Sequence, residues 1–387
     1  MKKYVSILLV FFITFSLISC GGSESPQTVV VPKTDTVIVP KTQECSLLSD
    51  GSCVNEDEVV EIYESYARLD ETSGDTLFKL RGWIYEPNTI SLLRSTFLTL
   101  LETKVSKSVT TPKDINLRID PFLADNQSGE VIKIKIGSQV YSLEESLSSG
   151  YFSGEIRLSN EVLESIYQEQ GSREYIAYKV LLPFEDKREF RGVVKPISND
   201  GVMIVSDIDD TLKISEVYIS ESRLLENIFY NKIKSAEGMS TLLKTLQNEN
   251  ENPLFFYVSG SPKQMYQSVT KFLKDKEYPS GYIYLKDFQL SPFTPSFYKF
   301  LDSESTYEHK LKNIGLLLKE FPRREFILVG DSGEKDPEVY GELLRQYESR
   351  IKAVYIRDVT DELLTNERFK KAFSIGIEKV SLIEADI

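Results

Sequence analysis

Three apolar runs in the second half of the chain each lead directly into a polar motif. The runs cover residues 202–205, 254–258 and 325–329, and their β-branched and aromatic residues are typical of buried parallel strands. In an open sheet of parallel strands, ligands bind at the carboxyl ends of the strands. The sequence therefore predicts an α/β fold whose binding site is made by the residues that follow these runs.

The first motif, at residues 207–211, contains three aspartates. Asp207 and Asp209 stand two positions apart, so their carboxylates can hold Mg²⁺, and one of them can attack phosphorus. A calcium loop would need Gly at its sixth position and Glu at its twelfth, where this chain has Leu212 and Tyr218. A solvated acidic loop remains the alternative for this motif taken alone.

The motifs after the second and third runs extend this prediction. The hydroxyl of Ser259 and the turn amides around Gly260 can bind phosphoryl oxygens, although Ser-Gly-Ser-Pro is also a common turn. Asp331 ends the third run and would complete a metal site. Asp336 precedes Pro337 at a predicted helix start, where a capping role and a metal-supporting role are equally expected.

Lys310 lies between the motifs that follow the second and third runs, at the start of a predicted amphipathic helix that carries Ile314, Leu317 and Leu318 on one face. A lysine on such a helix is ordinarily solvated, but its place in the motif order suits phosphate binding. His309 is the only histidine, which excludes a histidine-based phosphatase and a Ser-His-Asp hydrolase using a second histidine. We interpret His309 as structural.

The motifs together resemble those of the haloacid dehalogenase superfamily. Longer strings resemble its phosphatidate phosphatase catalytic-domain family, over a stretch of about 170 residues that begins near residue 190. These strings lie at residues 237–239, 256–259 with 261–262, 279–281, 309–310, 321–322, 330–340 and 355–358. The resemblance implies a haloacid-dehalogenase-like parallel sheet and a Mg²⁺-dependent phosphatase that forms an aspartyl-phosphate.

The resemblance also implies a role for each motif residue. The metal would be held by Asp207, Asp209 and Asp331 and supported by Asp336, while phosphate would be bound by Ser259, Gly260 and Lys310. Asp207 would be the nucleophile and Asp209 the general acid and base. The chain departs from the family pattern at Gly260 and Lys263, where the family has Asn and an aromatic residue. This departure concerns substrate choice and not the reaction type.

The N-terminus predicts export. Lys2 and Lys3 precede an apolar stretch at residues 5–18, which fits a signal peptide and is short for a membrane span. The stretch ends in a sequence that resembles a bacterial lipobox, which implies removal of residues 1–19 and lipidation of Cys20. An ordinary signal peptide followed by a chance cysteine is the alternative. Several acyl chains would anchor the protein to a membrane of the bacterial cell envelope, with the outer membrane favoured because Gly21 gives no retention signal.

Residues 20–54 read as a tether. Two copies of an eight-residue repeat, at residues 28–35 and 36–43, are rich in Pro and β-branched residues that favour extended backbone. Cys45 and Cys53 suit a small disulfide loop in an oxidising compartment, with two unpaired thiols as the alternative.

The apolar spacing within residues 55–197 predicts a second domain. Residues 56–69 show the spacing of an amphipathic helix. From Phe78 to Ile197 the apolar period is two, as in Ile115, Leu117 and Ile119 and again in Ile132, Ile134 and Ile136. We therefore expect a β-sandwich-like domain ahead of a phosphatase domain at residues 198–387.

Charge and composition narrow the function. The formal net charge of −13 argues against nucleic acid as a partner. The expected substrate is a phosphorylated lipid such as phosphatidate, reached through the membrane anchor. A soluble phosphorylated sugar, inositol or peptide is the alternative substrate, and a noncatalytic envelope-binding lipoprotein is the alternative of another class. An aromatic segment at residues 288–300 precedes Lys310, where it would either contact acyl chains or pack onto the domain.

Overall fold

The computed structural model describes residues 54–183, 185–288 and 302–384. The predicted signal peptide, Cys20, the repeats, the Cys45–Cys53 pair and nearly all of the aromatic segment lie outside the described residues. Among the residues that the structure does describe, no helix is long and apolar enough to cross a membrane.

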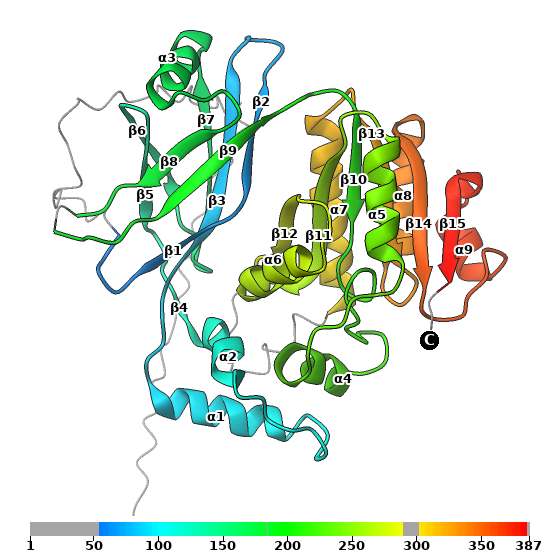
Figure 1. Cartoon of the computed structure of the whole chain (residues 1–387). Helices are drawn as coiled ribbons and strands as arrows, with labels where there is room; N and C mark the ends of the chain where they lie inside the picture. The colour runs from blue at the N-terminus through cyan, green and yellow to red at the C-terminus, as the bar shows by residue number, and fades with distance from the viewer. Residues whose placement is uncertain (1–53, 184, 289–301, 385–387) are drawn as a thin grey trace, which may run out of the picture. The chain divides into compact units, whose positions relative to one another are not determined.

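The C-terminal half contains a six-stranded parallel sheet in the order β12-β11-β10-β13-β14-β15 (Figure 1). Its strands are β10 (Val202–Ser206), β11 (Leu254–Pro262), β12 (Tyr282–Lys286), β13 (Glu325–Asp331), β14 (Ile351–Asp358) and β15 (Val380–Glu384). Its helices are α4 (Glu221–Leu225), α5 (Met239–Glu249), α6 (Tyr266–Asp275), α7 (Ser303–Glu320), α8 (Asp336–Tyr347) and α9 (Glu367–Ala372). A π-helical turn (Glu226–Tyr230) continues α4. The three predicted strands are confirmed as β10, β11 and β13, and the α/β class is confirmed with them.

Helices cover both faces of this sheet because every second strand residue points to the opposite side. Ile204 and Ile327 pack with Leu243 of α5 and Val269 of α6. On the other face, Val205 packs with the apolar side chains of α7 and α8, and Ile314, Leu317 and Leu318 are buried there as predicted. The sheet is therefore a buried central layer, and its carboxyl edge is where polar residues gather.

The N-terminal half forms one mixed sheet of nine strands. The strands are β1 (Val59–Ile62), β2 (Ser65–Leu69), β3 (Thr76–Glu86), β4 (Asp125–Asn126), β5 (Val131–Ile136), β6 (Gln139–Glu145), β7 (Tyr151–Leu158), β8 (Ile176–Val180) and β9 (Arg191–Ile197). The helices are α1 (Ser91–Glu102), α2 (Ile115–Leu123) and α3 (Asn160–Gln170). Because hydrogen bonds join all nine strands in a single sheet, the expectation of a two-sheet sandwich is not confirmed.

Two local predictions in this half are wrong. Residues 56–69 contain β1 and β2 instead of a helix. Tyr66 packs toward the parallel sheet and Ala67 toward the core of the mixed sheet, so both faces of β2 are buried and its apolar pattern imitates a helix. The reverse error occurs at α2, where Ile115 and Ile119 are buried one turn apart and Leu117 is 76% exposed. Ile132, Ile134 and Ile136 lie in β5 as predicted.

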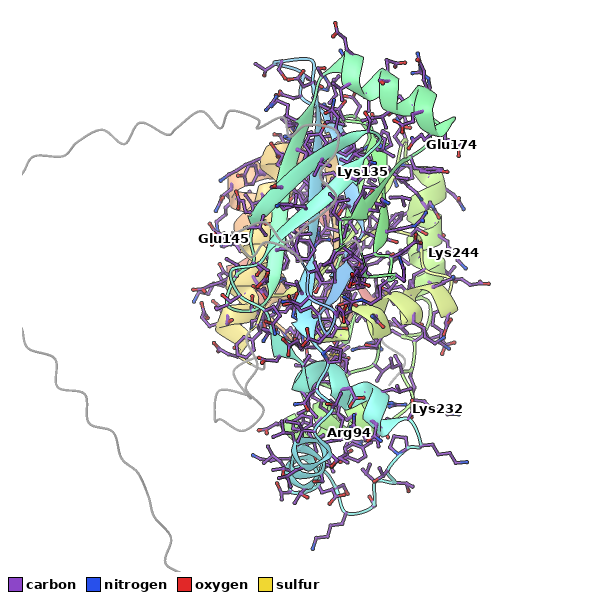
Figure 2. All side chains as sticks on the ribbon, turned by 90° about the vertical axis from the view of Figure 1, so that its left-hand side faces the viewer. Arg94, Lys135, Glu145, Glu174, Lys232 and Lys244 are labelled. Atoms are coloured by element: carbon purple, nitrogen blue, oxygen red, sulfur yellow. The ribbon has the colours of Figure 1, made fainter. Side chains whose placement is uncertain are left out.

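Charged side chains of both signs lie on the mixed sheet. Figure 2 shows Lys135 of β5 and Glu145 of β6 on the same face.

Candidate active site

The parallel register brings three motifs to one edge of the sheet. β10 pairs with β11 on one side and β13 on the other, so Asp207, Ser259 and Asp331 emerge from neighbouring strands. The backbone N–H of Asp207 donates to the carbonyl of Val329 at 2.8 Å, which fixes the first motif against β13. The predicted site residues from these motifs are therefore assembled by strand order alone.

Lys310 is the centre of the charged network. Its Nζ lies 2.9 Å from Asp207 Oδ1, 2.9 Å from Glu334 Oε2 and 2.5 Å from Asp336 Oδ1. The side chain is 1% exposed. Burial by itself lowers the pKa of this ammonium, but the charges of Asp207, Asp336 and Glu334 outweigh burial and raise the pKa well above its usual range. Lys310 is therefore a permanent cation inside the site.

Carboxylate oxygens of Asp207, Asp331 and Glu334 lie within 4.8 Å of one another. Asp331 Oδ1 accepts hydrogen bonds from the N–H groups of Gly333 and Glu334, whereas its buried Oδ2 has no partner among the described residues. An orphaned buried oxygen beside two further carboxylates is unfavourable without a cation. This donor set suits a hard divalent cation such as Mg²⁺.

The pKa shifts of the same carboxylates also favour a bound divalent cation. Burial raises the pKa of Asp207 well above its usual range, and neighbouring carboxylates add to the effect while Lys310 opposes it. Burial also raises the pKa of Asp331, again with help from Asp336 and Glu334. Repulsion among these groups is what a bound divalent cation would relieve.

Asp209 has different surroundings from Asp207. Its Oδ1 lies 2.8 Å from Lys213 Nζ and accepts a hydrogen bond from Ser215 Oγ at 2.6 Å. Its Oδ2 accepts from Ser259 Oγ at 2.8 Å and from Ser261 Oγ at 2.6 Å. Although burial raises its pKa, the Lys213 charge and these hydrogen bonds outweigh burial and hold the pKa well below the usual range. Asp209 is thus ionised in this arrangement, and its carboxylate is outside the cluster of Asp207, Asp331 and Glu334.

The loop after β10 explains how Lys213 reaches Asp209. Asp210 has a φ of +55° and its carboxylate accepts three hydrogen bonds, from the N–H groups of Ser215, Glu216 and Val217. Asp is one of the residues that tolerates the left-handed conformation because its side chain bonds locally. This tight turn folds Lys213 and Ser215 back over the first motif.

The second motif makes a crowded turn. Ser259 Oγ donates to Asp209 and accepts from the N–H of Ser261 at 2.9 Å. A Cβ on residue 260 would lie 2.7 Å from Thr306 Cγ2, so glycine is required for α7 to approach this closely. The predicted phosphate contacts of Ser259 and Gly260 stay predictions.

Asp336 does not cap its helix. It is the first residue of α8, but its Oδ2 accepts from the N–H of Asp331 at 3.1 Å and its Oδ1 binds Lys310. The carboxylate therefore ties the lysine to the end of β13, as a support for the acidic cluster.

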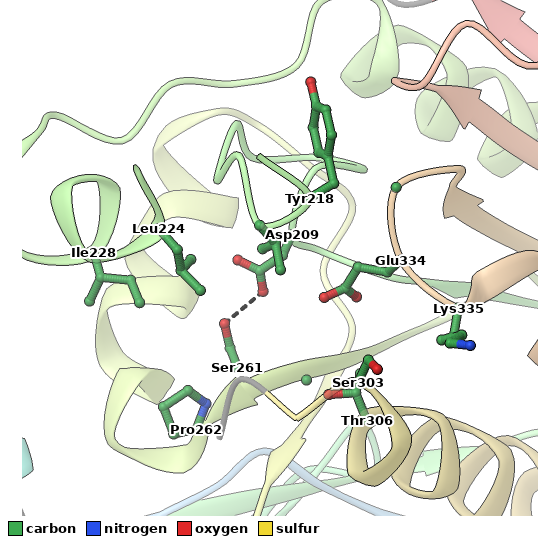
Figure 3. A pocket seen from close by; sticks show the side chains of 13 residues that line it. Asp209, Tyr218, Leu224, Ile228, Ser261, Pro262, Ser303, Thr306, Glu334 and Lys335 are labelled. Carbon is green, nitrogen blue, oxygen red and sulfur yellow. Dashed lines mark hydrogen bonds between the residues drawn. The ribbon is translucent and has the colours of Figure 1, made fainter. Parts of the chain in front are cut away.

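A cavity of about 180 Å³ opens at this edge (Figure 3). Asp209, Ser261 and Glu334 form its polar side, and Figure 3 shows Leu224 and Ile228 facing Asp209 from the helical segment after the first motif. The remaining lining residues are Val217, Tyr218, Gly260, Pro262, Ser303, Thr306, Gly333 and Lys335. The cavity thus combines an anionic and hydroxyl-rich floor with an apolar wall.

Two contributors were missed by the sequence reasoning. Glu334 stands in the motif that follows the third run, and Lys213 stands four residues after Asp209, but neither was selected from the sequence. The signal for Glu334 was its position three residues after Asp331 in a turn leading to a helix. His309, interpreted as structural, bonds the carbonyl of Tyr284 through Nε2 at 3.3 Å, and burial lowers its pKa to about 4.

The chain is similar in sequence to known proteins over the domain that contains this site. Residues 202–358 match the family "Phosphatidate phosphatase APP1, catalytic domain". The chain is 34% identical to phosphatidate phosphatase APP1 of Saccharomyces cerevisiae over 163 residues, which is 42% of this chain and 26% of that protein. It is 27% identical over 185 residues to the uncharacterized protein C29B5.04c of Schizosaccharomyces pombe, covering 46% of this chain and 29% of that protein.

The chain therefore spans less than a third of the length of either curated relative. A crystal structure of beta-glucuronidase from Parabacteroides merdae covers 85% of this chain and 47% of that protein, but its TM-score of 0.24 and 9% identity carry no argument. The matched residues run from β10 to the end of β14 and include every motif at the sheet edge. The α/β domain of this chain is therefore similar to the catalytic domain of the phosphatidate phosphatase APP1 family.

Proposed function

We propose that this protein is a Mg²⁺-dependent phosphomonoester phosphatase that works through an aspartyl-phosphate on Asp207, with phosphatidate as its substrate. The observation that carries the proposal is the buried Asp207 carboxylate beside Lys310 and within 4.8 Å of Asp331 and Glu334. A nucleophilic carboxylate, a cation and a metal-ligand set in one buried place are the parts that phosphoryl transfer requires.

Asp207 performs the first displacement. One of its carboxylate oxygens attacks phosphorus, the bond from phosphorus to the leaving oxygen breaks, and that oxygen takes a proton and departs as an alcohol. Thr211 donates a hydrogen bond to Asp207 Oδ2 at 3.0 Å, whereas Oδ1 accepts no hydrogen bond among the described residues. Oδ1 is therefore the oxygen better suited to attack, because the Lys310 ammonium at 2.9 Å makes an ion pair with it but no directed hydrogen bond.

Asp209 handles the proton. In the second displacement, water attacks the phosphorus of the aspartyl-phosphate, Asp209 accepts the proton of that water, and the bond to Asp207 breaks to release phosphate. The low pKa of Asp209 provides the carboxylate form that this step needs. Donation to the leaving oxygen in the first displacement requires Asp209 to be protonated, which a weakening of its contact with Lys213 favours.

The acidic cluster would hold the metal. Asp207, Asp331 and Glu334 are the residues whose oxygens fit it, with Asp336 as support, and the inclusion of the Asp209 carboxylate stays a prediction. When bound, Mg²⁺ supplies charge neutralisation between the nucleophile and the phosphoryl oxygens.

Two observations support a lipid substrate. The matched family and the yeast relative carry the name phosphatidate phosphatase, and the cavity has an apolar wall that includes Leu224 and Ile228. A soluble phosphorylated sugar, inositol or peptide remains the second candidate, since the phosphate end of the site is common to all phosphomonoesters. A lipid anchor at Cys20 would place the enzyme on a membrane of the cell envelope, where effective concentration replaces electrostatic attraction to an anionic lipid.

The decisive test is phosphate release from a panel of phosphatidate vesicles, sugar phosphates, inositol phosphates and phosphopeptides. Each substrate is assayed with Mg²⁺ and with a chelator. Mg²⁺-dependent release that is greatest for phosphatidate supports the proposal. Release that is greatest for a soluble phosphomonoester would support the second candidate substrate class. If no substrate of the panel releases phosphate, a noncatalytic binding function would be favoured.

A further inference from the structure

Four lysines are buried in the described part of the chain, and three of them have carboxylate partners. Lys310 has three, Lys213 lies 2.8 Å from Asp209, and Lys263 lies 2.6 Å from Asp287. Lys286 is the exception. It is 4% exposed, and its Nζ has no hydrogen-bond partner among the described residues. A buried ammonium without a partner is unfavourable, so an anion that binds next to Lys286 would be stabilised by its charge.

Lys286 is placed beside the cavity at the sheet edge, one residue outside its lining in the strand register. It is the last residue of β12, and its Cα pairs in register with Pro262 of β11. Pro262 lines the cavity that also contains Ser261 and Glu334 (Figure 3). The lysine therefore stands at the same carboxyl edge as the catalytic motifs, one strand beyond Ser259.

Among the described residues, no group that faces Lys286 neutralises its charge by direct contact. Burial lowers the pKa of its ammonium, while the more distant charges of Asp302 and Glu334 oppose that effect. The Phe288 ring centroid is 6.0 Å from Nζ, at the outer limit of a cation–π contact. Burial keeps the pKa of the neighbouring His309 near 4, so that ring adds no second cation at neutral pH.

The charge balance of the site explains what such a lysine could do. Among the described residues, the five carboxylates of Asp207, Asp209, Asp331, Glu334 and Asp336 contact two buried ammonium groups, those of Lys213 and Lys310, while the half-buried Lys335 lines the cavity beside Glu334. Both of these ammonium groups are already paired with carboxylates. A phosphomonoester dianion that enters the cavity needs a cation that is not already engaged, and Lys286 is the buried lysine that meets this condition among the described residues.

We propose that Lys286 is a second cationic substrate-binding residue, which binds an oxygen of the substrate's phosphoryl group from the β12 side of the cavity. Lys310 then mainly holds the nucleophile and its supporting carboxylates, while Lys286 supplies the charge that attracts and orients the anion. This inference rests on the proposed function and adds a residue to its binding site.

The experiment compares Lys286→Met, Lys286→Gln and Lys286→Arg with the unchanged full-length chain. Lys319→Met is the matched control, because Lys319 is an exposed lysine on α7. Binding of inorganic phosphate is measured by calorimetry with Mg²⁺ present, KM and kcat are measured on phosphatidate in detergent micelles and on p-nitrophenyl phosphate, and Tm is measured for each variant.

Loss of one charged hydrogen bond predicts weaker phosphate binding and a higher KM for both substrates, by about 10- to 100-fold, in the Met and Gln variants. The Arg variant should recover most of this loss, and the Met variant should keep or raise Tm because an unpaired buried charge has been removed. The Lys319 variant should match the unchanged chain. Using Gln as well as Met keeps the test valid if one of the two fails to fold.

Unchanged phosphate affinity in a folded Met or Gln variant would overturn the inference, as would a lowered Tm with phosphate affinity intact. A weakening confined to phosphatidate would also overturn it, because the lysine would then contact another part of the lipid. If the unchanged chain binds phosphate but hydrolyses nothing, the proposed function fails on its own, while the calorimetric comparison still decides the role of Lys286.

Discussion

The Nζ atom of Lys310 lies 2.9 Å from the Oδ1 atom of Asp207, yet this oxygen accepts no hydrogen bond among the described residues. The lysine therefore compensates the charge of Asp207 without holding the lone pairs of that oxygen in a directed bond. A nucleophilic carboxylate needs this combination, because Lys310 opposes the rise in the pKa of Asp207 that burial causes and still leaves the oxygen able to form a new bond.

Asp207→Asn should abolish turnover. The amide keeps the shape of the side chain but removes the attacking charge, so kcat should fall by at least about 10⁴-fold, as for other catalytic nucleophiles. Phosphate release under saturating substrate measures the loss, and an unchanged or higher Tm shows that the fold is kept. Residual activity of a tenth would mean that Asp207 is not the nucleophile.

Asp331→Asn should remove the stabilisation of the folded protein by Mg²⁺. Mg²⁺ should raise the Tm of the unchanged chain, because binding to the folded state alone stabilises it, and the rise should shrink or vanish in the variant. Asp361→Asn is the control, since Asp361 is exposed and its φ of +55° is one that asparagine tolerates. An equal Mg²⁺ response in all three proteins would place the metal elsewhere.

Lys310→Met should destabilise the protein. It leaves the buried carboxylates of Asp207 and Asp336 and the half-buried one of Glu334 without their counter-ion, and the loss of one partner from a buried network is worth about 3–5 kcal/mol. Urea unfolding measures the change. Adding Asp336→Asn to this variant should recover part of the stability, because it removes one of the uncompensated charges. If the double variant is less stable than the single one, charge repulsion is not the cause.

Glu61→Gln should stabilise the protein at high pH. Burial raises the pKa of Glu61 from 4.5 to about 7, although a hydrogen bond from Gln267 opposes the effect. Between these values the folded state holds a proton that the unfolded state has released, so the stability contributed by this group falls as pH rises from 4.5 to 7. The glutamine variant avoids that loss.

Thermal unfolding at pH 5 and pH 8 tests this prediction. The gain from Glu61→Gln should be about 2 kcal/mol at pH 8 and smaller at pH 5. Glu174→Gln, at an exposed position, should show no such difference. Equal effects of Glu61→Gln at the two pH values would show that this carboxyl does not titrate in the folded protein near pH 7.

Cys20→Ala should release the protein from membranes. If acyl chains on Cys20 are the anchor, their loss should move the protein to the soluble fraction without a change in its rate on a soluble phosphomonoester. Membrane fractionation after expression in a bacterium that processes lipoproteins provides the measurement. Retention in the membrane fraction would show that another part of the chain makes the attachment.

The sequence alone was sufficient to predict the three central strands and the motifs that meet at the sheet edge. A buried parallel strand is apolar on both faces, so β10, β11 and β13 appear as short uninterrupted apolar runs, and the residues after them must meet at one edge. The order of residues along the chain is therefore enough to bring Asp207, Ser259 and Asp331 together. It also places Asp336 at the start of α8.

The N-terminal half shows where apolar spacing becomes ambiguous. β2 contributes Tyr66 to one core and Ala67 to another, so its pattern matches a helix, and α2 buries Ile115 and Ile119 at a spacing that two-residue alternation also contains. Periodicity reports which residues are buried, but the neighbouring elements decide which backbone conformation buries them.

Only the tertiary structure decided how the charges are shared. The turn at Asp210 brings Lys213 onto Asp209, while α7 delivers Lys310 to Asp207 and the Asp331 turn adds Glu334. Residue types and motif order determine which groups reach the sheet edge. Their pairing depends on distances of a few ångströms between separate elements, and at such distances in a buried site the Coulomb energy decides which carboxylate is ionised and which is left for a metal.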